Sequence, residues 1–163
     1  MGYGEFPSGK YFDPSGFTCM IWMKVLSYNN YERIIDFGNG VSSDNVIIYL
    51  DHTTGKFKLC FHKNTNQMKI SSKSIELNEW VHITVTSSDN NVNLYLDGVE
   101  EFSYTAEISD VVRTKNYLGK SQNTPNVHAI FDDMKIFNRA LKIDEILAEM
   151  EKKQPYKLIE IEF

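Results

Sequence analysis

The chain has 163 residues, a length that predicts one domain with a core of its own. Its formal net charge of −5 excludes an ordinary nucleic-acid-binding protein, because phosphate binding needs a concentrated patch of Lys and Arg. The sequence contains no run of about 18 apolar residues, so we expect no insertion into a membrane.

The N-terminal segment is expected to be mostly irregular, because residues 1–16 contain four glycines and two prolines. The first residues show neither the charged nor the apolar segment of a signal peptide. A secreted form of the protein would therefore be a fragment or a mature chain.

Alternating apolar and polar residues predict a series of short strands, since successive side chains of a strand point to opposite faces. The strand at 17–25 has apolar residues on both faces, which indicates a central position in a sheet. Further strands, each bounded by turn residues, are predicted at 32–37, 46–50, 56–62, 68–71, 80–86, 92–96, 99–104, 116–119 and 128–137.

The stretch from Trp80 to Gly98 gives the clearest signal for the fold class. Apolar residues alternate with polar ones on both sides of a polar turn at 87–91. The Asp97-Gly98 dipeptide then favours the positive φ of a tight hairpin turn. The apolar residues expected to face the core are Val81, Ile83, Val85, Val92, Leu94 and Leu96.

The two cysteines are expected to be free thiols, buried or half-buried. Cys19 shares a face with Phe17 and Ile21 and points to a core. Cys60 alternates with Leu59 and points the other way. This arrangement disfavours a disulfide between them.

The period of the apolar pattern changes near the C-terminus. The spacing of Ile143, Ile146, Leu147 and Met150 predicts an amphipathic helix over 143–153. Its apolar stripe either packs on the sandwich, which is the ordinary use of a single stripe, or binds a partner. Residues 157–163 alternate again and predict a closing strand. The fold class is therefore all-β, an antiparallel β-sandwich with one short C-terminal helix, and residues 1–163 form a single domain.

Six stretches, taken in order along residues 17–150, resemble the laminin-G-like jelly roll of the concanavalin A-like lectin/glucanase superfamily. The strand around Trp80 to His82 matches the most recognisable strand of that family, and its hairpin partner follows. The matching stretches are Phe17-Thr18 with Trp22, Ile34 to Gly38, Glu79 to Thr86, Leu94 to Gly98, Tyr117 to Gly119, and Asp132 to Leu141 with Glu145-Ile146.

Two departures from the family pattern matter. Members of the family have a strand ahead of the one at 17–25, and residues 1–16 do not supply a convincing one. The chain instead has an extra alternating segment at 157–163. Our hypothesis is that this tail fills the vacant place in the sheet, so that truncation after Lys153 would destabilise the fold.

The resemblance implies a ligand site on one sheet face or on the loops at its rim. If Val81, Ile83 and Val85 face the core, the residues between them face outward with polar residues of the next strand. Aromatic rings mixed with Asn, Asp and His suit sugars. The alternative is that Trp80 and His82 are structural, as their place in the family signature suggests. The candidate ligand-binding residues are Asn93, Tyr95, Trp22 and His82.

The resemblance also implies a structural calcium ion. Asp132 matches a position at which relatives hold calcium, and the turn around Asp36 and Gly38 would supply further oxygen ligands. Asp132 is expected to be buried beside Met134, so its carboxylate needs a partner. The alternatives are backbone amides, or an ion pair with Arg33 or Arg139.

No catalytic role is expected. Glu160 and Glu162 lie two residues apart, as a glycosidase pair could. However, the glucanases of the superfamily carry their acidic residues on a central strand, and these two lie at the end of the chain. No nucleophile, zinc or phosphate-binding motif is present.

We therefore expect a non-catalytic binding module that recognises glycans or extracellular proteins as part of a larger protein, with calcium as its candidate cofactor. The alternative is a protein–protein interaction or structural domain without a sugar site, and a glycoside-active enzyme ranks third. The resemblance favours an extracellular or cell-surface location. The oligomeric state is not predicted.

Overall fold

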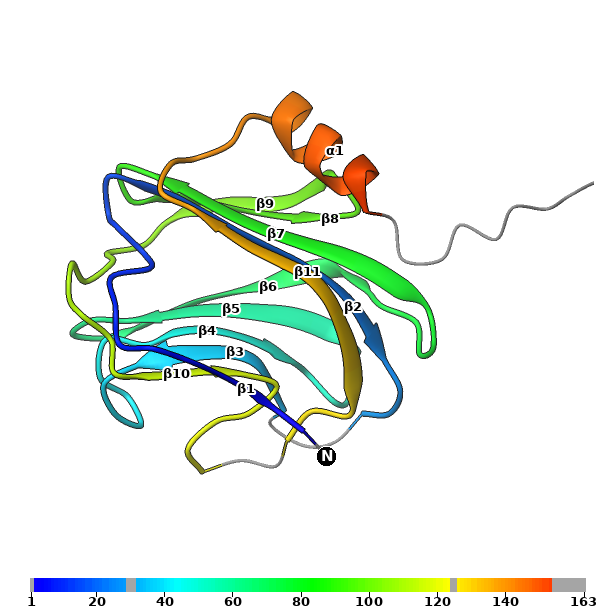
Figure 1. The fold of residues 1–163 in the computed structure, drawn as a ribbon, viewed down its shortest axis with the longest axis horizontal. Coiled ribbons are helices and arrows are strands. Elements are labelled where there is room, and N and C mark those ends of the chain that lie inside the picture. Colours follow the sequence, from blue (N-terminus) through cyan, green and yellow to red (C-terminus); the bar gives the residue numbers. More distant parts are fainter. Residues whose placement is uncertain (1, 29–31, 124–125, 154–163) are drawn as a thin grey trace, which may run out of the picture.

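The structure, a computed structural model, describes residues 2–28, 32–123 and 126–153. Two antiparallel sheets pack face to face, and a single helix lies on the outside of one of them (Figure 1). This arrangement confirms the predicted β-sandwich with one short helix. No helix within the described ranges has the length and apolar character needed to cross a membrane.

The first sheet has six strands and joins segments that lie far apart in the chain. Its long central strands come from consecutive hairpins, and its edge is completed by the first strand of the chain. Every pair is antiparallel. In spatial order the strands are β1 (Gly4–Phe6), β10 (Lys115–Leu118), β3 (Arg33–Gly38), β4 (Val46–Leu50), β5 (Lys56–His62) and β6 (Asn66–Ser74).

The second sheet has five strands and carries the helix. Helix α1 (Ile143–Lys152) lies across its outer face (Figure 1). In spatial order the strands are β11 (Ala129–Phe137), β2 (Gly16–Val25), β7 (Trp80–Ser88), β8 (Asn91–Leu96) and β9 (Val99–Thr105).

The main core lies between the two sheets and follows the predicted alternation. The apolar residues that were expected to face inward on the Trp80–Gly98 hairpin are all buried there. Phe57, Leu59 and Phe61 of β5 approach them from the other sheet. Both cysteines are free thiols and buried, as the sequence predicted.

Tight turns join the strands of the β7–β8–β9 meander. Asp89 and Asn90 have φ of 49° and 64°, and Asp97 and Gly98 have φ of 52° and 76°. Two consecutive positive φ angles define the type I′ turn, whose twist matches that of the flanking strands. The predicted turn at Asp97-Gly98 is therefore confirmed.

The N-terminal segment, expected to be mostly irregular, contains a strand. Gly4–Phe6 pairs with β10 in the register Gly4 to Leu118. Three residues are too few to show an alternating pattern, so only the pairing identifies this strand. The predicted strand at 157–163, and the hypothesis that it fills a vacant place in a sheet, lie outside the described residues.

A β-bulge interrupts β11 and changes which side chains face inward. The pairing with β2 shifts between Asp132 and Lys135, and Asp133 has a positive φ of 48°. Phe131 and Met134 therefore both pack against the main core, although strict alternation would place them on opposite faces. The expectation that Asp132 is buried beside Met134 is wrong, since its side chain is 44% exposed.

Candidate functional site

The outer face of the five-stranded sheet, where we expected a ligand, is covered by α1. Trp22 is only 8% exposed and His82 only 2% exposed, so the expectation that they face a ligand is wrong. The physical reason is that the apolar stripe of α1 needs an apolar surface, and β2 and β7 supply it. The buried cluster under the helix consists of Met20, Trp22, Leu141, Ile146 and Met150, with Trp80, Tyr95 and Phe137 packed at its margin.

His82 has the surroundings of a structural residue. Its ring lies 5.0 Å from the Trp22 ring, centroid to centroid, in an edge-on arrangement. The hydroxyl of Thr84 is 3.2 Å from its Nδ1 atom. Burial lowers the pKa of His82 to about 4, so the imidazole is neutral at pH 7.

Asn93 and Tyr95 lie on the same sheet and are half-buried. The Asn93 amide donates to the hydroxyl of Thr86 at 3.4 Å, and Tyr95 packs at the margin of the cluster under α1. They remain partly accessible, so their role as ligand contacts stays a prediction.

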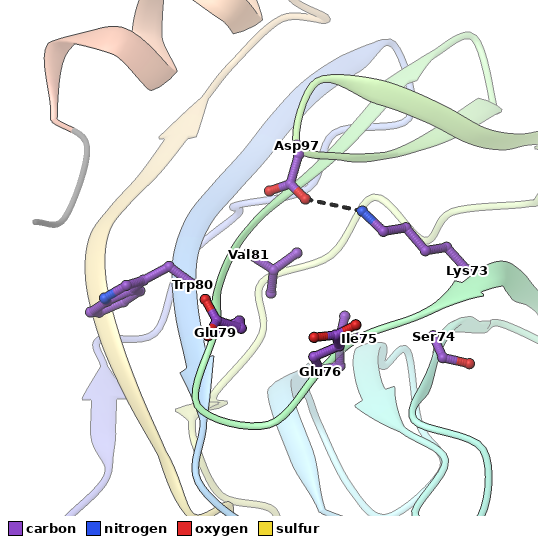
Figure 2. A pocket seen from close by; sticks show the side chains of 8 residues that line it. All are labelled: Lys73, Ser74, Ile75, Glu76, Glu79, Trp80, Val81 and Asp97. Atoms are coloured by element: carbon purple, nitrogen blue, oxygen red, sulfur yellow. Dashed lines mark hydrogen bonds and ion pairs between the residues drawn. The ribbon is translucent and has the colours of Figure 1, made fainter. Parts of the chain in front are cut away.

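A small pocket of about 210 Å³ lies at one end of the sandwich, between the approach to β7 and the β8–β9 turn (Figure 2). Lys73 forms an ion pair with Asp97 at 3.3 Å, and Glu76 and Glu79 add two further carboxylates. Figure 2 shows the Trp80 ring pointing away from this ion pair, toward β11. The pocket therefore offers charged groups but no aromatic surface turned toward a ligand.

The outer face of the six-stranded sheet lies on the opposite side of the sandwich from α1 (Figure 1). A hollow of about 330 Å³ lies on this face, over β3, β4, β5 and β6. We call it the open-face hollow. Its lining residues are Arg33, Ser42, Ile47, Tyr49, Cys60, His62, Asn66 and Met68.

Strand pairing explains why these side chains meet. Arg33 is the direct partner of Tyr49, while Ile47 pairs with Cys60 and Cys60 with Met68. Paired residues of an antiparallel sheet point to the same face, so strands distant in sequence contribute to one surface.

The charges at the hollow balance one another. Arg33 Nη1 donates to Asp36 Oδ2 at 2.6 Å, and Asn45 Nδ2 donates to Asp36 Oδ1 at 2.7 Å. Burial raises the pKa of the Asp36 carboxyl, which Arg33 opposes. Burial, followed by the charge of Arg33, lowers the pKa of His62 below its ordinary value, so this ring is neutral at pH 7.

The hollow combines an aromatic surface with neutral hydrogen-bonding groups. Tyr49 donates its hydroxyl hydrogen to the sulfur of Met68 at 2.9 Å, which holds the phenol ring in place. His62 and Asn66 line the other side of the hollow, and Nδ1 of His62 is buried without a hydrogen-bond partner among the described residues. A few polar groups around an apolar surface form the usual lining of a site for a small neutral ligand.

Arg33, Tyr49, His62 and Asn66 were not among the ligand-binding residues predicted from the sequence. A signal was present, because His62 alternates with Phe57, Leu59 and Phe61, which were predicted to face inward. What the pattern lacked was any indication of which outer face the helix would cover.

The three predicted calcium ligands come from both sheets. Asp36 lies on β3 in one sheet and is held by Arg33 and Asn45, whereas Asp132 lies on β11 in the other sheet. The carboxylate of Asp132 accepts from the backbone N–H of Asp133 at 2.8 Å. Over residues 2–28, 32–123 and 126–153, no group of three or more His, Cys, Asp or Glu side chains could hold a metal ion. The predicted calcium site combined Asp132 with backbone carbonyls, so calcium at Asp132 stays a prediction.

Comparison with solved structures identifies similar folds. Domain 4 of AbnA, an extracellular GH43 arabinanase from Geobacillus stearothermophilus solved with arabinotriose, is 17% identical with a TM-score of 0.76, covering 89% of this chain and 70% of that one. The botulinum neurotoxin serotype D binding domain is 18% identical with a TM-score of 0.68, covering 85% of this chain and 37% of that one. Trypanosoma rangeli sialidase is 15% identical with a TM-score of 0.64, covering 82% and 22%.

These identities are low enough that the likeness concerns the fold alone. The chain spans only a minor part of the toxin and sialidase structures. No curated protein sequence matches it.

The Laminin_G_3 family model, described as the concanavalin A-like lectin/glucanases superfamily, matches residues 1–147. With its two-sheet jelly-roll architecture and this match over most of its length, the chain belongs to the Laminin_G_3 family of the concanavalin A-like lectin/glucanase superfamily.

Proposed function

We propose that this domain is a non-catalytic carbohydrate-binding module that holds a neutral glycan in the open-face hollow. The observation that carries the proposal is the juxtaposition of the Tyr49 ring with Arg33, His62 and Asn66 on the sheet face opposite α1. An aromatic ring offers a flat surface to the C–H face of a sugar, and the polar groups bind hydroxyls.

Two proteins of the same fold support a glycan as the ligand. AbnA domain 4 was solved in complex with arabinotriose. Entry of botulinum neurotoxin type C depends on two ganglioside molecules, and that toxin structure is 17% identical with a TM-score of 0.63, covering 85% of this chain and 36% of that one. We transfer only the ligand class from them, because these similarities concern the fold.

The chemistry of the hollow favours binding over hydrolysis. Glycoside hydrolysis uses a pair of carboxyl groups on either side of the scissile bond. The residues that line the hollow include no Asp or Glu, and the nearby Asp36 is engaged by Arg33 and Asn45. Glu160 and Glu162 lie outside the described residues.

As the family resemblance implies, we place the domain in a larger extracellular or cell-surface protein.

The test is a glycan array followed by calorimetry on the glycans that bind, with arabinotriose included as a probe. We expect Tyr49→Ala to lower the affinity at least tenfold, which corresponds to about 1.4 kcal/mol of binding free energy. The matched control is Tyr28→Ala, since Tyr28 is also half-buried but packs against the main core. This control should bind like the wild type, and thermal melting establishes that both variants are folded.

Two outcomes would contradict the proposal. If Asn93→Ala or Tyr95→Ala abolishes binding while Tyr49→Ala does not, the ligand lies on the five-stranded sheet. If the array gives no signal, a protein–protein interaction or structural domain replaces the carbohydrate-binding module.

Calcium binding at Asp132 is a separate proposal, supported only by the family resemblance. A ligand that binds only the native state raises the melting temperature. The measurement compares melting in excess calcium with melting in EDTA, for the wild type and for Asp132→Asn. A rise that this substitution removes supports calcium at Asp132, whereas identical melting curves contradict it.

A further inference from the structure

A row of side chains crosses the outer face of the six-stranded sheet, which we call the open face, at right angles to its strands. Tyr117 of β10 is the direct partner of Asp36 in β3, and the row continues through β4 and β5 to Met68 of β6. Neighbouring strands are about 4.8 Å apart, so the row from β10 to β6 spans about 19 Å. The open-face hollow occupies only the part of the row over β3 to β6.

The middle of this row is buried, whereas its ends are accessible. Asp36 and Ile47 are each 2% exposed, although they lie on the outer face of the sheet. Met68 at one end is 48% exposed, and Tyr117 at the other end is half-buried. The accessible side chains of the row therefore stand at its two ends, with buried side chains between them.

An aromatic pair stands at the β10 end of this row. The rings of Tyr3 and Tyr117 are 6.4 Å apart, centroid to centroid, and meet edge to face. The Lys120 ammonium lies 3.9 Å from the centroid of Tyr3 and 5.1 Å from that of Tyr117. These cation–π contacts hold the two rings together, and the ammonium offers hydrogen-bond donors at the same place.

The two aromatic regions of the face are too far apart for one sugar ring. Tyr49 and Tyr117 are separated by two strand spacings, about 10 Å, and by two residues along the strand, about 7 Å. A ligand that contacts both must therefore contain several linked sugars. Arg33 lies between them, next to Asp36.

We infer that the ligand is an oligosaccharide chain that crosses the strands from the open-face hollow to the Tyr3–Tyr117 pair, an inference that rests on the proposed function. The hollow beside Tyr49 forms the main contact region. The Tyr3–Tyr117 pair, which β1 and the residues before it bring to the edge of the sheet, forms a second region that only longer chains reach.

The test uses an array printed with arabinan, xylan, mannan and cellulose oligosaccharides of two to eight units. We expect affinity to rise with chain length by about tenfold beyond the shortest chain that binds. Tyr3→Ala and Tyr117→Ala should remove this increase without weakening the shorter chain. Tyr3 is 49% exposed, so its substitution leaves the fold intact even if Tyr117→Ala does not. Tyr28→Ala again serves as the matched control.

The outcomes separate this inference from the proposed function. If Tyr49→Ala weakens all chains but both Tyr3→Ala and Tyr117→Ala bind long chains like the wild type, the second contact region is disproved and the carbohydrate-binding module stands. Affinity that does not change with length disproves the region in the same way. Absence of binding to the whole printed set contradicts the proposed function, and the inference falls with it.

Discussion

His82 is buried as a neutral imidazole, and this couples the stability of the fold to pH. Its pKa is lowered to about 4 by burial, from an ordinary value of about 6.5 in the unfolded chain. Between these two values the unfolded state binds more protons than the folded state. Stability is therefore fully present above about pH 6.5 and is lost as the pH falls toward 4.

We expect the titration of His82 to lower the unfolding free energy of the wild type by up to about 3 kcal/mol between pH 7 and pH 4. His82→Gln removes the titrating group, so its stability should fall less over the same interval, whatever its stability at pH 7. The measurement is urea unfolding at both pH values. The matched control is His52→Gln, which replaces an exposed histidine and should keep the wild-type dependence. Equal pH dependence of His82→Gln and the wild type would refute this account.

Asp36 owes its environment to a neighbouring glycine. A Cβ atom on Gly38 would lie 2.4 Å from Nδ2 of Asn45, a distance that real structures do not show. The glycine therefore lets Asn45 reach Asp36 and satisfy its buried carboxylate together with Arg33. These contacts show that the Asp36 carboxylate and Gly38 serve the packing of the sheet.

Helix α1 is attached to the sandwich by only part of its apolar stripe. Ile146 is completely buried and Met150 nearly so, whereas Ile143 is 45% exposed. The side chain of Leu147 passes close to Gly98, where a Cβ atom would lie 2.5 Å from its Cδ2. The glycine of the tight β8–β9 turn therefore also gives the helix room to approach the sheet.

The difference between two isoleucines of α1 provides a test of this docking. Ile146→Ala should lower the unfolding free energy by about 3 kcal/mol, because it leaves a cavity beneath the helix. Ile143→Ala should change it by less than about 0.5 kcal/mol, because that side chain is partly in water. Urea unfolding of both variants measures the difference. Equal losses of unfolding free energy in the two variants would show that α1 does not pack on the sheet through Ile146.

The bulge in β11 shows where an element departs from its sequence pattern. Alternation along 128–137 predicted one continuous face through Asp132 and Met134. The positive φ of Asp133 breaks that register, and a single Asp in a strand gives no warning of it because Asp is common in ordinary turns. The expectation of a buried Asp132 carboxylate depended on the unbroken register.

At the scale of the whole molecule, the position of α1 decides which surface can meet a ligand. Both sheets have an outer face with aromatic and polar residues. The helix removes Trp22 and His82 of one sheet from solvent and leaves Tyr49, His62 and Tyr117 of the other at the surface. The two binding predictions, on Tyr49 and on the Tyr3–Tyr117 pair, follow from this asymmetry.

The sequence by itself determined the class of fold and most of its elements. Alternation along the Trp80–Gly98 hairpin and along 56–62 identified the inward faces, and the spacing from Ile143 to Met150 identified the helix. These features are local, because backbone geometry sets their periods of 2 and 3.6. The family resemblance, confirmed over residues 1–147, depended on the same local patterns.

Only the tertiary structure decided which outer face is covered, where β1 pairs and how the open-face residues meet. Alternation marks two faces of every strand, but it carries no information about what packs against the outer one. That choice depends on the path of the chain after β11 and on the pairing of strands far apart in sequence, such as Arg33 with Tyr49 and Tyr117 with Asp36. The candidate site is formed by these long-range pairings, so no single stretch of the sequence contains it.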